Sequence, residues 1–201
     1  MRTKMIDLTV PLAALLLVAA TTSCTTVAPA AAPVVERLGN TTLHYKGSQL
    51  DVVVSYRFAD FNLGAQWLFL DVAISSNTRT AVEVKRSAIA IRTPGGEIVP
   101  LATQREFGEA YAGLAGTLAR ADIAREPLNY YPGRRPEGLD FLAAPGSGIT
   151  LLAVWVNDLN VAFGRLAFMV PGGVKPGGYE LRINLPHGLV AIPFQLGAAH
   201  S

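Results

Sequence analysis

The chain has 201 residues, of which 50% are hydrophobic and 16% are charged, and its formal net charge at pH 7 is +2. So small a charge gives no electrostatic case for nucleic acid as a partner, because nucleic-acid-binding domains carry strongly basic surfaces. The single cysteine, Cys24, excludes a disulfide within the chain.

The first 23 residues have the pattern of an export signal. Arg2 and Lys4 form a short positive region, and thirteen mostly apolar residues follow from Leu8 to Ala20. This run is too short to cross a hydrocarbon core of ~30 Å, which takes ~20 residues of helix. We therefore predict that residues 1–23 are a processing signal. Its removal leaves 15 basic against 14 acidic side chains.

Small residues lead from this run into the cysteine, in the order Ala20-Thr21-Thr22-Ser23-Cys24. This pattern resembles the signal peptides of bacterial lipoproteins, although that family most often has Leu where this chain has Thr21. The resemblance implies that Cys24 is acylated and anchors the protein in a lipid bilayer, since several acyl chains hold a protein almost permanently. Thr25, where the family's inner-membrane members have Asp, implies the periplasmic face of the outer membrane if the cell is Gram-negative. The alternatives are an ordinary secretory signal cleaved nearby, or a free thiol.

Residues 24–38 follow the signal with two prolines and no periodic apolar face, so we expect a lipidated cysteine on a flexible tether. The alternative is that Val34 and Val35 begin the first strand. Residues 39–201 leave about 160 residues, which suits a single domain that buries ~70% of its chain surface.

Alternating apolar residues predict strands in the first half of this domain. The runs 41–46 and 49–59 flank a Gly-Ser turn and form a predicted hairpin, and 66–76 has the strongest strand pattern. The run 81–92 changes parity near Arg86-Ser87, which requires a bulge or bend. A short edge strand over 97–101 follows.

One amphipathic helix is predicted over 103–122. Thr103 and Glu106 have the spacing of a capping box, in which each side chain satisfies a backbone donor near the other. Phe107, Tyr111, Leu114 and Leu118 form one apolar stripe. The stripe could pack on the domain, lie on a membrane or bind a partner helix. We favour packing on the domain, because the polar face is not enriched in Lys and Arg.

A long irregular segment is predicted over 126–148, and loops of this length are uncommon unless they are functional or disordered. It contains Tyr130, Tyr131, Arg134 and Arg135, and Tyr and Arg dominate binding hot spots. Together with Trp67 of the strongest strand, these residues are our candidate partner or ligand site. The alternative is a solvated crossover with locally packed tyrosines and, for Trp67, cover by a loop.

The C-terminal part predicts further strands. The apolar run 149–156, which contains Trp155, is consistent with a central strand buried on both sides. The run 165–170 is expected to pair across the glycine-rich segment 171–178 with a strand at 179–185, followed by 189–196. The result is an antiparallel β-sandwich of about nine strands with one inserted helix.

This order of strands and turns is similar to the immunoglobulin-like domains of many bacterial lipoproteins. The likeness lies in the block from Trp67 to Pro100 and in the closing run from Phe168 to Leu181. It implies an immunoglobulin-like β-sandwich with a binding or assembly role in the cell envelope, and it transfers no functional residue to this chain.

Catalytic and metal-binding patterns are not found in the sequence. The three histidines, His44, His187 and His200, have no spacing typical of metal ligands, and Ser147 lacks the setting of an activated nucleophile. The glycine-rich segment 172–178 lacks the Lys-Ser/Thr ending of a phosphate-binding loop, so we interpret it as a hairpin loop. We therefore expect no catalytic residue, no metal and no cofactor, and a hydrolase is the least supported function.

These observations predict a non-enzymatic, membrane-anchored lipoprotein of the cell envelope that acts as a protein-interaction or assembly module. Its expected partners are the lipid bilayer, through Cys24, and another envelope protein. The alternative is a periplasmic carrier that binds an apolar or glycan ligand between the sheets or beneath the long loop. Such a carrier would use Trp67, Trp155 and the loop tyrosines.

Overall fold

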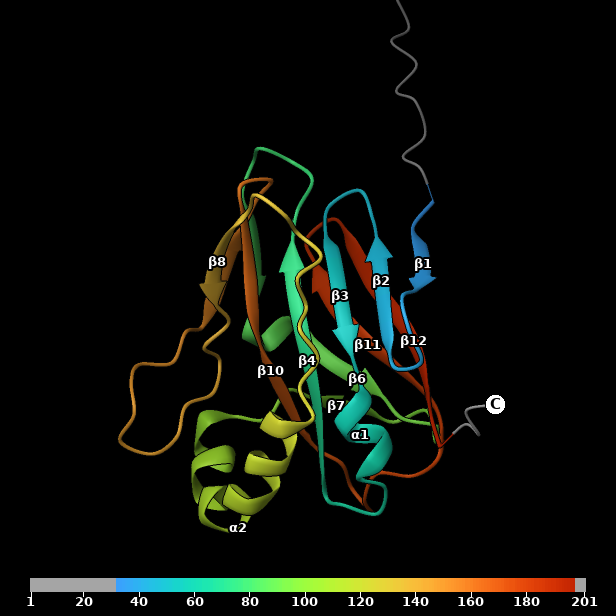
Figure 1. The fold of residues 1–201 in the computed structure, drawn as a ribbon, viewed down its shortest axis with the longest axis vertical. Coiled ribbons are helices and arrows are strands. Elements are labelled where there is room, and N and C mark those ends of the chain that lie inside the picture. Colours follow the sequence, from blue (N-terminus) through green and yellow to red (C-terminus); the bar gives the residue numbers. More distant parts are fainter. Residues whose placement is uncertain (1–31, 198–201) are drawn as a thin grey trace, which may run out of the picture.

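The structure, a computed structural model, describes residues 32–197. The predicted processing signal, Cys24, most of the predicted tether and His200 lie outside these residues. Twelve strands and one long helix make up most of the described chain, which is therefore mainly β (Figure 1).

A six-stranded sheet forms one layer. In spatial order its strands are β1 (Val34–Arg37), β2 (Thr42–Lys46), β3 (Asp51–Ser55), β4 (Trp67–Ser75), β10 (Asn160–Met169) and β8 (Arg135–Gly138). All neighbours pair antiparallel except β10 and β8, which are parallel. Val34 and Val35 thus belong to the first strand, at the end of the predicted tether.

A four-stranded sheet forms the second layer. Its order is β12 (Gly188–Leu196), β11 (Gly177–Leu185), β6 (Ile89–Arg92) and β7 (Ile98–Pro100). The short strands β5 (Val82–Lys85) and β9 (Ala153–Val156) pair separately as a two-stranded ribbon. The three-residue 3₁₀ helix η1 (Arg86–Ala88) joins β5 to β6, at the position where the change of parity predicts a bulge or bend, and this prediction is confirmed.

The two sheets face each other around one apolar core. Alternate residues of each strand point inward, and the largest fully buried side chains of this core come from both sheets and from segments 50–56 and 139–141. They include Leu50, Tyr56, Leu68, Leu70, Ile74, Ile89, Ile91, Phe141, Leu166, Phe168 and Leu181. These buried side chains pack in the space between the two sheets.

The predicted hairpin is confirmed, but its second strand ends at Ser55. The expected strand end is instead the short helix α1 (Arg57–Phe61). The Tyr56 N–H donates to the Thr41 carbonyl at 3.0 Å, and the helical turn then carries Phe58 to the other side of the sheet. There Phe58 packs beside Phe69. In a continuous strand, Phe58 would point to the same face as Tyr56 and could not make this contact.

The predicted amphipathic helix is confirmed as α2 (Gln104–Ile123). The Thr103 hydroxyl accepts from the Glu106 N–H, and the Glu106 carboxylate accepts from the Thr103 N–H at 2.7 Å. These bonds hold the pKa of Glu106 below its usual value. The apolar stripe packs on the outer face of the six-stranded sheet, with Phe107 edge-on to Trp67 at 6.2 Å, as the favoured interpretation predicts (Figure 1).

Two predictions about the C-terminal half are wrong. The run 149–156 is not a central strand, because only Ala153–Val156 is a strand and it pairs with β5 alone. Strand β10 does not pair with β11 either, because they belong to different sheets. Segment 171–178 is thus a crossover: Gly172 and Gly173 adopt φ of 71° and 79°, and buried Val174 donates to the Ala65 carbonyl at 2.8 Å.

Candidate functional site

The segment that follows α2 crosses the outer face of β3, β4 and β10. Leu128 and Tyr131 pack on Val53, Ala73 and Val161 of the sheet below. The segment then enters β8, which pairs with the start of β10. The predicted long loop is therefore attached to the sheet over much of its length.

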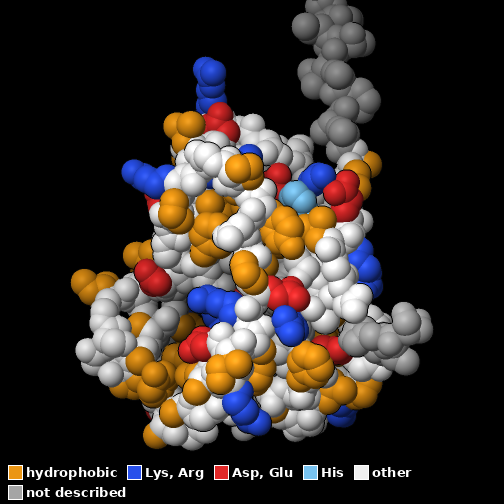
Figure 2. Space-filling model, viewed as in Figure 1, with side chains coloured by type: hydrophobic (Ala, Val, Ile, Leu, Met, Phe, Trp, Pro, Cys, Tyr) orange, Lys and Arg blue, Asp and Glu red, His pale blue; other side chains and the backbone are white. Residues whose placement is uncertain are grey.

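An ionic cluster lies between α2 and this segment. Asp71 of β4 and Arg165 of β10 are directly opposite in the register, and Arg165 Nε lies 2.9 Å from Asp71 Oδ1. Arg165 also contacts Asp122 of α2 at 2.8 Å, and Arg125 lies 3.4 Å from Asp71. Figure 2 shows basic and acidic side chains gathered in the middle of this face. The buried carboxylate of Asp71 is thus neutralised by two guanidinium groups.

Glu126 binds the start of the segment to the first hairpin. Its carboxylate accepts hydrogen bonds from the hydroxyls of Thr42 and of Ser55, the latter at 3.0 Å, and Arg57 lies 3.8 Å away. A second carboxylate, Asp51, accepts from the Tyr131 hydroxyl at 2.8 Å and contacts His44. Each acid therefore connects a strand of the sheet to the segment that covers it.

Tyr131 is the buried centre of this second contact. Burial, together with the nearby carboxylate of Asp51, raises the pKa of Tyr131 far above its usual value, so the phenol stays protonated and donates at neutral pH. Arg134 lies 5.0 Å above the Tyr131 ring and donates to the Ser76 carbonyl at 3.0 Å. Tyr131 and Arg134 therefore serve contacts inside the domain.

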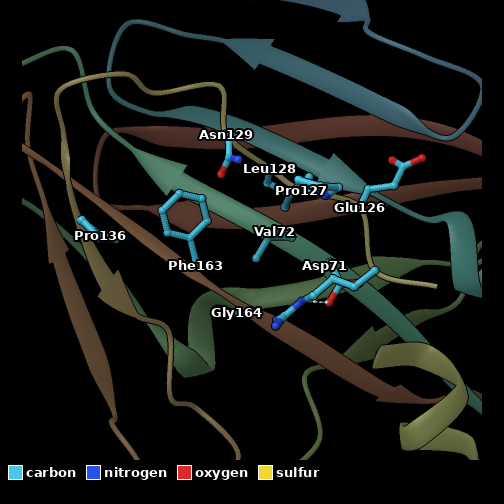
Figure 3. A pocket seen from close by; sticks show the side chains of 10 residues that line it. Asp71, Val72, Glu126, Pro127, Leu128, Asn129, Pro136, Phe163 and Gly164 are labelled. Carbon is cyan, nitrogen blue, oxygen red and sulfur yellow. Dashed lines mark ion pairs between the residues drawn. The ribbon is translucent and has the colours of Figure 1, made fainter. Parts of the chain in front are cut away.

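The segment and the sheet enclose a cleft of about 350 Å³ (Figure 3). Phe163 and Gly164 of β10 contribute to its floor, and Pro127 and Asn129 lie on the side of the segment. A second hollow of about 340 Å³, toward α2, shares Arg125, Phe163 and Gly164 with the first. Gly164 is required here, because a Cβ would stand 2.6 Å from the Cβ of Leu139.

The structure does not bring the five predicted binding residues to one surface. Trp67 is 6% exposed and lies beneath α2, so it packs the helix on the sheet. Tyr131 and Arg134 make the internal contacts described above. Tyr130 and Arg135 are exposed, and Arg135 forms an ion pair with Glu137.

Five large apolar side chains from eleven consecutive residues are exposed, and we name them the apolar strip. Their exposed fractions are 88% for Ile149, 38% for Leu151, 79% for Leu152, 55% for Trp155 and 71% for Leu159. Trp155 points outward because it lies opposite Glu83 on the outer face of the β5–β9 ribbon, whereas Val154 and Val156 point to the core. The sequence pattern missed this surface, because a continuous apolar run reads the same whether it is buried or exposed.

Comparison with protein-family models, with curated proteins and with solved structures finds no match. Among residues 32–197, no helix is long and apolar enough to span a membrane. In the same range, no three His, Cys, Asp or Glu side chains are grouped to hold a metal ion.

The ionic cluster gives a stability prediction. Asp71→Asn leaves the largely buried Arg165 with one carboxylate partner fewer, so we expect the free energy of unfolding to fall by about 3 kcal/mol. Urea denaturation followed by tryptophan fluorescence measures this change. The control is Glu109→Gln, which removes an exposed ion pair with Arg105 and should cost at most ~0.5 kcal/mol. Equal, small losses for both variants would contradict the role given to Asp71.

Proposed function

We propose that this protein is a membrane-anchored lipoprotein of the cell envelope that acts as a non-enzymatic interaction or assembly module. The N-terminal pattern ending in Cys24 supports the anchor, and Thr25 supports a position at the periplasmic face of the outer membrane if the cell is Gram-negative. Two facing sheets around one core support an immunoglobulin-like β-sandwich, with the parallel strand β8 and helix α2 as departures from that family.

The apolar strip is the observation that carries the proposed interaction. Apolar side chains grouped on a surface mark sites of protein contact, and Trp is the residue type most enriched among binding hot spots. Trp155, Leu152 and Ile149 are exposed within seven consecutive residues, and the pairing of β9 with β5 holds the backbone of Trp155 in place. A partner that covers them gains roughly 25 cal/mol for each Å² of apolar surface removed from water.

The position of the strip in the fold supports the same proposal. The chain that follows the proposed anchor enters the domain at β1, which is one edge of the six-stranded sheet. The strip continues through a tight turn into β10, beside β8 at the opposite edge, and the segment between β8 and β9 projects from that side (Figure 1). An anchor at the first edge would leave the strip accessible to a partner.

Lipidation gives a direct prediction. Globomycin blocks the peptidase that cleaves lipoprotein precursors, so treated cells should accumulate a precursor larger than the mature protein by residues 1–23. Immunoblotting of membranes measures this, and Cys24→Ser, which removes the thiol that is acylated, should also leave residues 1–23 attached without the drug. Unchanged processing under globomycin would show that an ordinary secretory signal is cleaved instead.

The interaction surface gives a second prediction. Ile149→Gln, Trp155→Gln and Leu159→Gln combined should reduce recovery of the envelope partner in crosslinked pull-downs at least about tenfold, because the loss of one hot spot of 2 kcal/mol already exceeds that factor. The matched control combines Phe61→Gln, Ile98→Gln and Leu189→Gln, which are exposed apolar residues elsewhere on the domain. The proposal fails if both triple variants recover the partner equally.

The alternative carrier function is favoured by the cleft and hollow of about 350 and 340 Å³ beneath the segment after α2. Their aromatic and charged lining suits an apolar or glycan ligand, although Trp67 and Trp155 do not line either space. Native mass spectrometry separates the two functions, because a carrier should retain a copurifying ligand and an interaction module should not.

A further inference from the structure

A cavity of about 510 Å³ lies at the edge of the second layer, where β7 ends and β9 begins. Strand β9 pairs with β5 and strand β7 pairs with β6, and η1 joins β5 to β6. Arg86 N–H donates to the Leu152 carbonyl at 2.9 Å on one side, and Leu101 N–H donates to the Ile89 carbonyl at 3.0 Å on the other. The gap between them, over η1, is a notch larger than the cleft beneath the long segment.

Arg86 lines this notch and has unused hydrogen-bonding capacity. Its Nη2 donates to the Ala102 carbonyl, but its buried Nε has no partner among the described residues. No carboxylate within the described residues lies within ion-pair distance of the guanidinium. Burial lowers the pKa of Arg86 from its usual value, which reflects the loss of water around this charge. A guanidinium has five donors, and a bond to the Ala102 carbonyl uses only one of them.

The acidic side chains of the notch have other partners. The Glu106 carboxylate accepts from both the N–H and the hydroxyl of Thr103 at 2.7 Å, as part of the helix cap. Glu83 lies 3.4 Å from Lys85. The carboxylate of Glu106 stabilises the charged form of Arg86 without direct contact. Neither Glu106 nor Glu83 forms an ion pair with Arg86.

The remaining walls are mainly apolar. Pro100 and Leu101 form one side, and Leu152 and Ala153 form the other. Leu152 is 79% exposed, so the opening of the notch is apolar as well. A guanidinium beside apolar walls matches a ligand that has an anionic head and an apolar body.

We propose that this notch binds a small carboxylate with a short apolar body, whose head group contacts the Arg86 guanidinium and whose body lies between Leu101 and Leu152. Arg binds carboxylates through two parallel N–H groups, which gives the head group a fixed orientation. The site adjoins the apolar strip and shares Leu152 with it, but the proposed ligand contacts do not require the interaction function.

Nuclear magnetic resonance of the ¹⁵N-labelled full-length chain tests this with hexanoate as the probe. Hexanoate should shift the Arg86 Nε–H signal and the Ala153 amide signal saturably. The matched probe 1-hexanol, which lacks the charge, should shift neither. Acetate, which lacks the body, should bind at least about tenfold more weakly, because buried methylenes contribute binding free energy. Equal effects of hexanoate and hexanol, or of hexanoate and acetate, would overturn the proposal.

Two separate variants test the roles of Arg86 and Leu152, so the test does not fail if one variant does not fold. Arg86→Gln should abolish the hexanoate shift of the Ala153 amide. Leu152→Asn changes an exposed side chain and should weaken hexanoate binding while acetate binding stays the same. The control Leu159→Asn changes a similarly exposed leucine outside the notch and should leave hexanoate binding unchanged. Unchanged binding in Leu152→Asn would contradict the proposed position of the apolar body.

Discussion

The outer face of the six-stranded sheet must be covered, and most of the structure outside the sandwich core follows from that requirement. Strand β4 is buried along its whole length, so its outward side chains need partners just as its inward ones do. These side chains are chemically different along the strand: aromatic at Trp67 and Phe69, acidic at Asp71, and small at Ala73. Each group is covered by a different part of the chain.

Helix α2 covers the aromatic end, where Phe107 and Leu114 complete an apolar cluster with Trp67 and Phe69. The guanidinium groups of Arg165 and Arg125 neutralise the acidic centre. Beyond them the buried Tyr131 covers the small residues and donates to Asp51. Tyr131, which the sequence pattern predicts as a binding residue, thus holds the segment after α2 on the sheet. A segment without a helix or strand pattern gives no local sign that it is attached to a sheet.

Local patterns predicted the elements whose signals lie within a few residues. The capping box of Thr103 and Glu106 and the stripe from Phe107 to Leu118 define α2, and the parity change near Arg86 predicts a bulge or bend where η1 lies. Pairing between distant strands could not be predicted in the same way. Nothing local distinguishes the crossover at Gly172 from a hairpin, since both need glycine at positive φ. Nor does an apolar run such as 149–156 indicate whether another element covers it.

The sequence pattern predicts Trp155 in a strand buried on both sides, but its side chain is exposed. This exposed side chain is the basis of the proposed function. Placing a photo-crosslinking amino acid at position 155 in intact cells tests that function most directly. The proposal predicts a crosslink to one envelope protein at position 155 and none at the exposed position 98 on the neighbouring sheet. A normally processed protein that gives no crosslink at 155, or equal crosslinks at both positions, would contradict it.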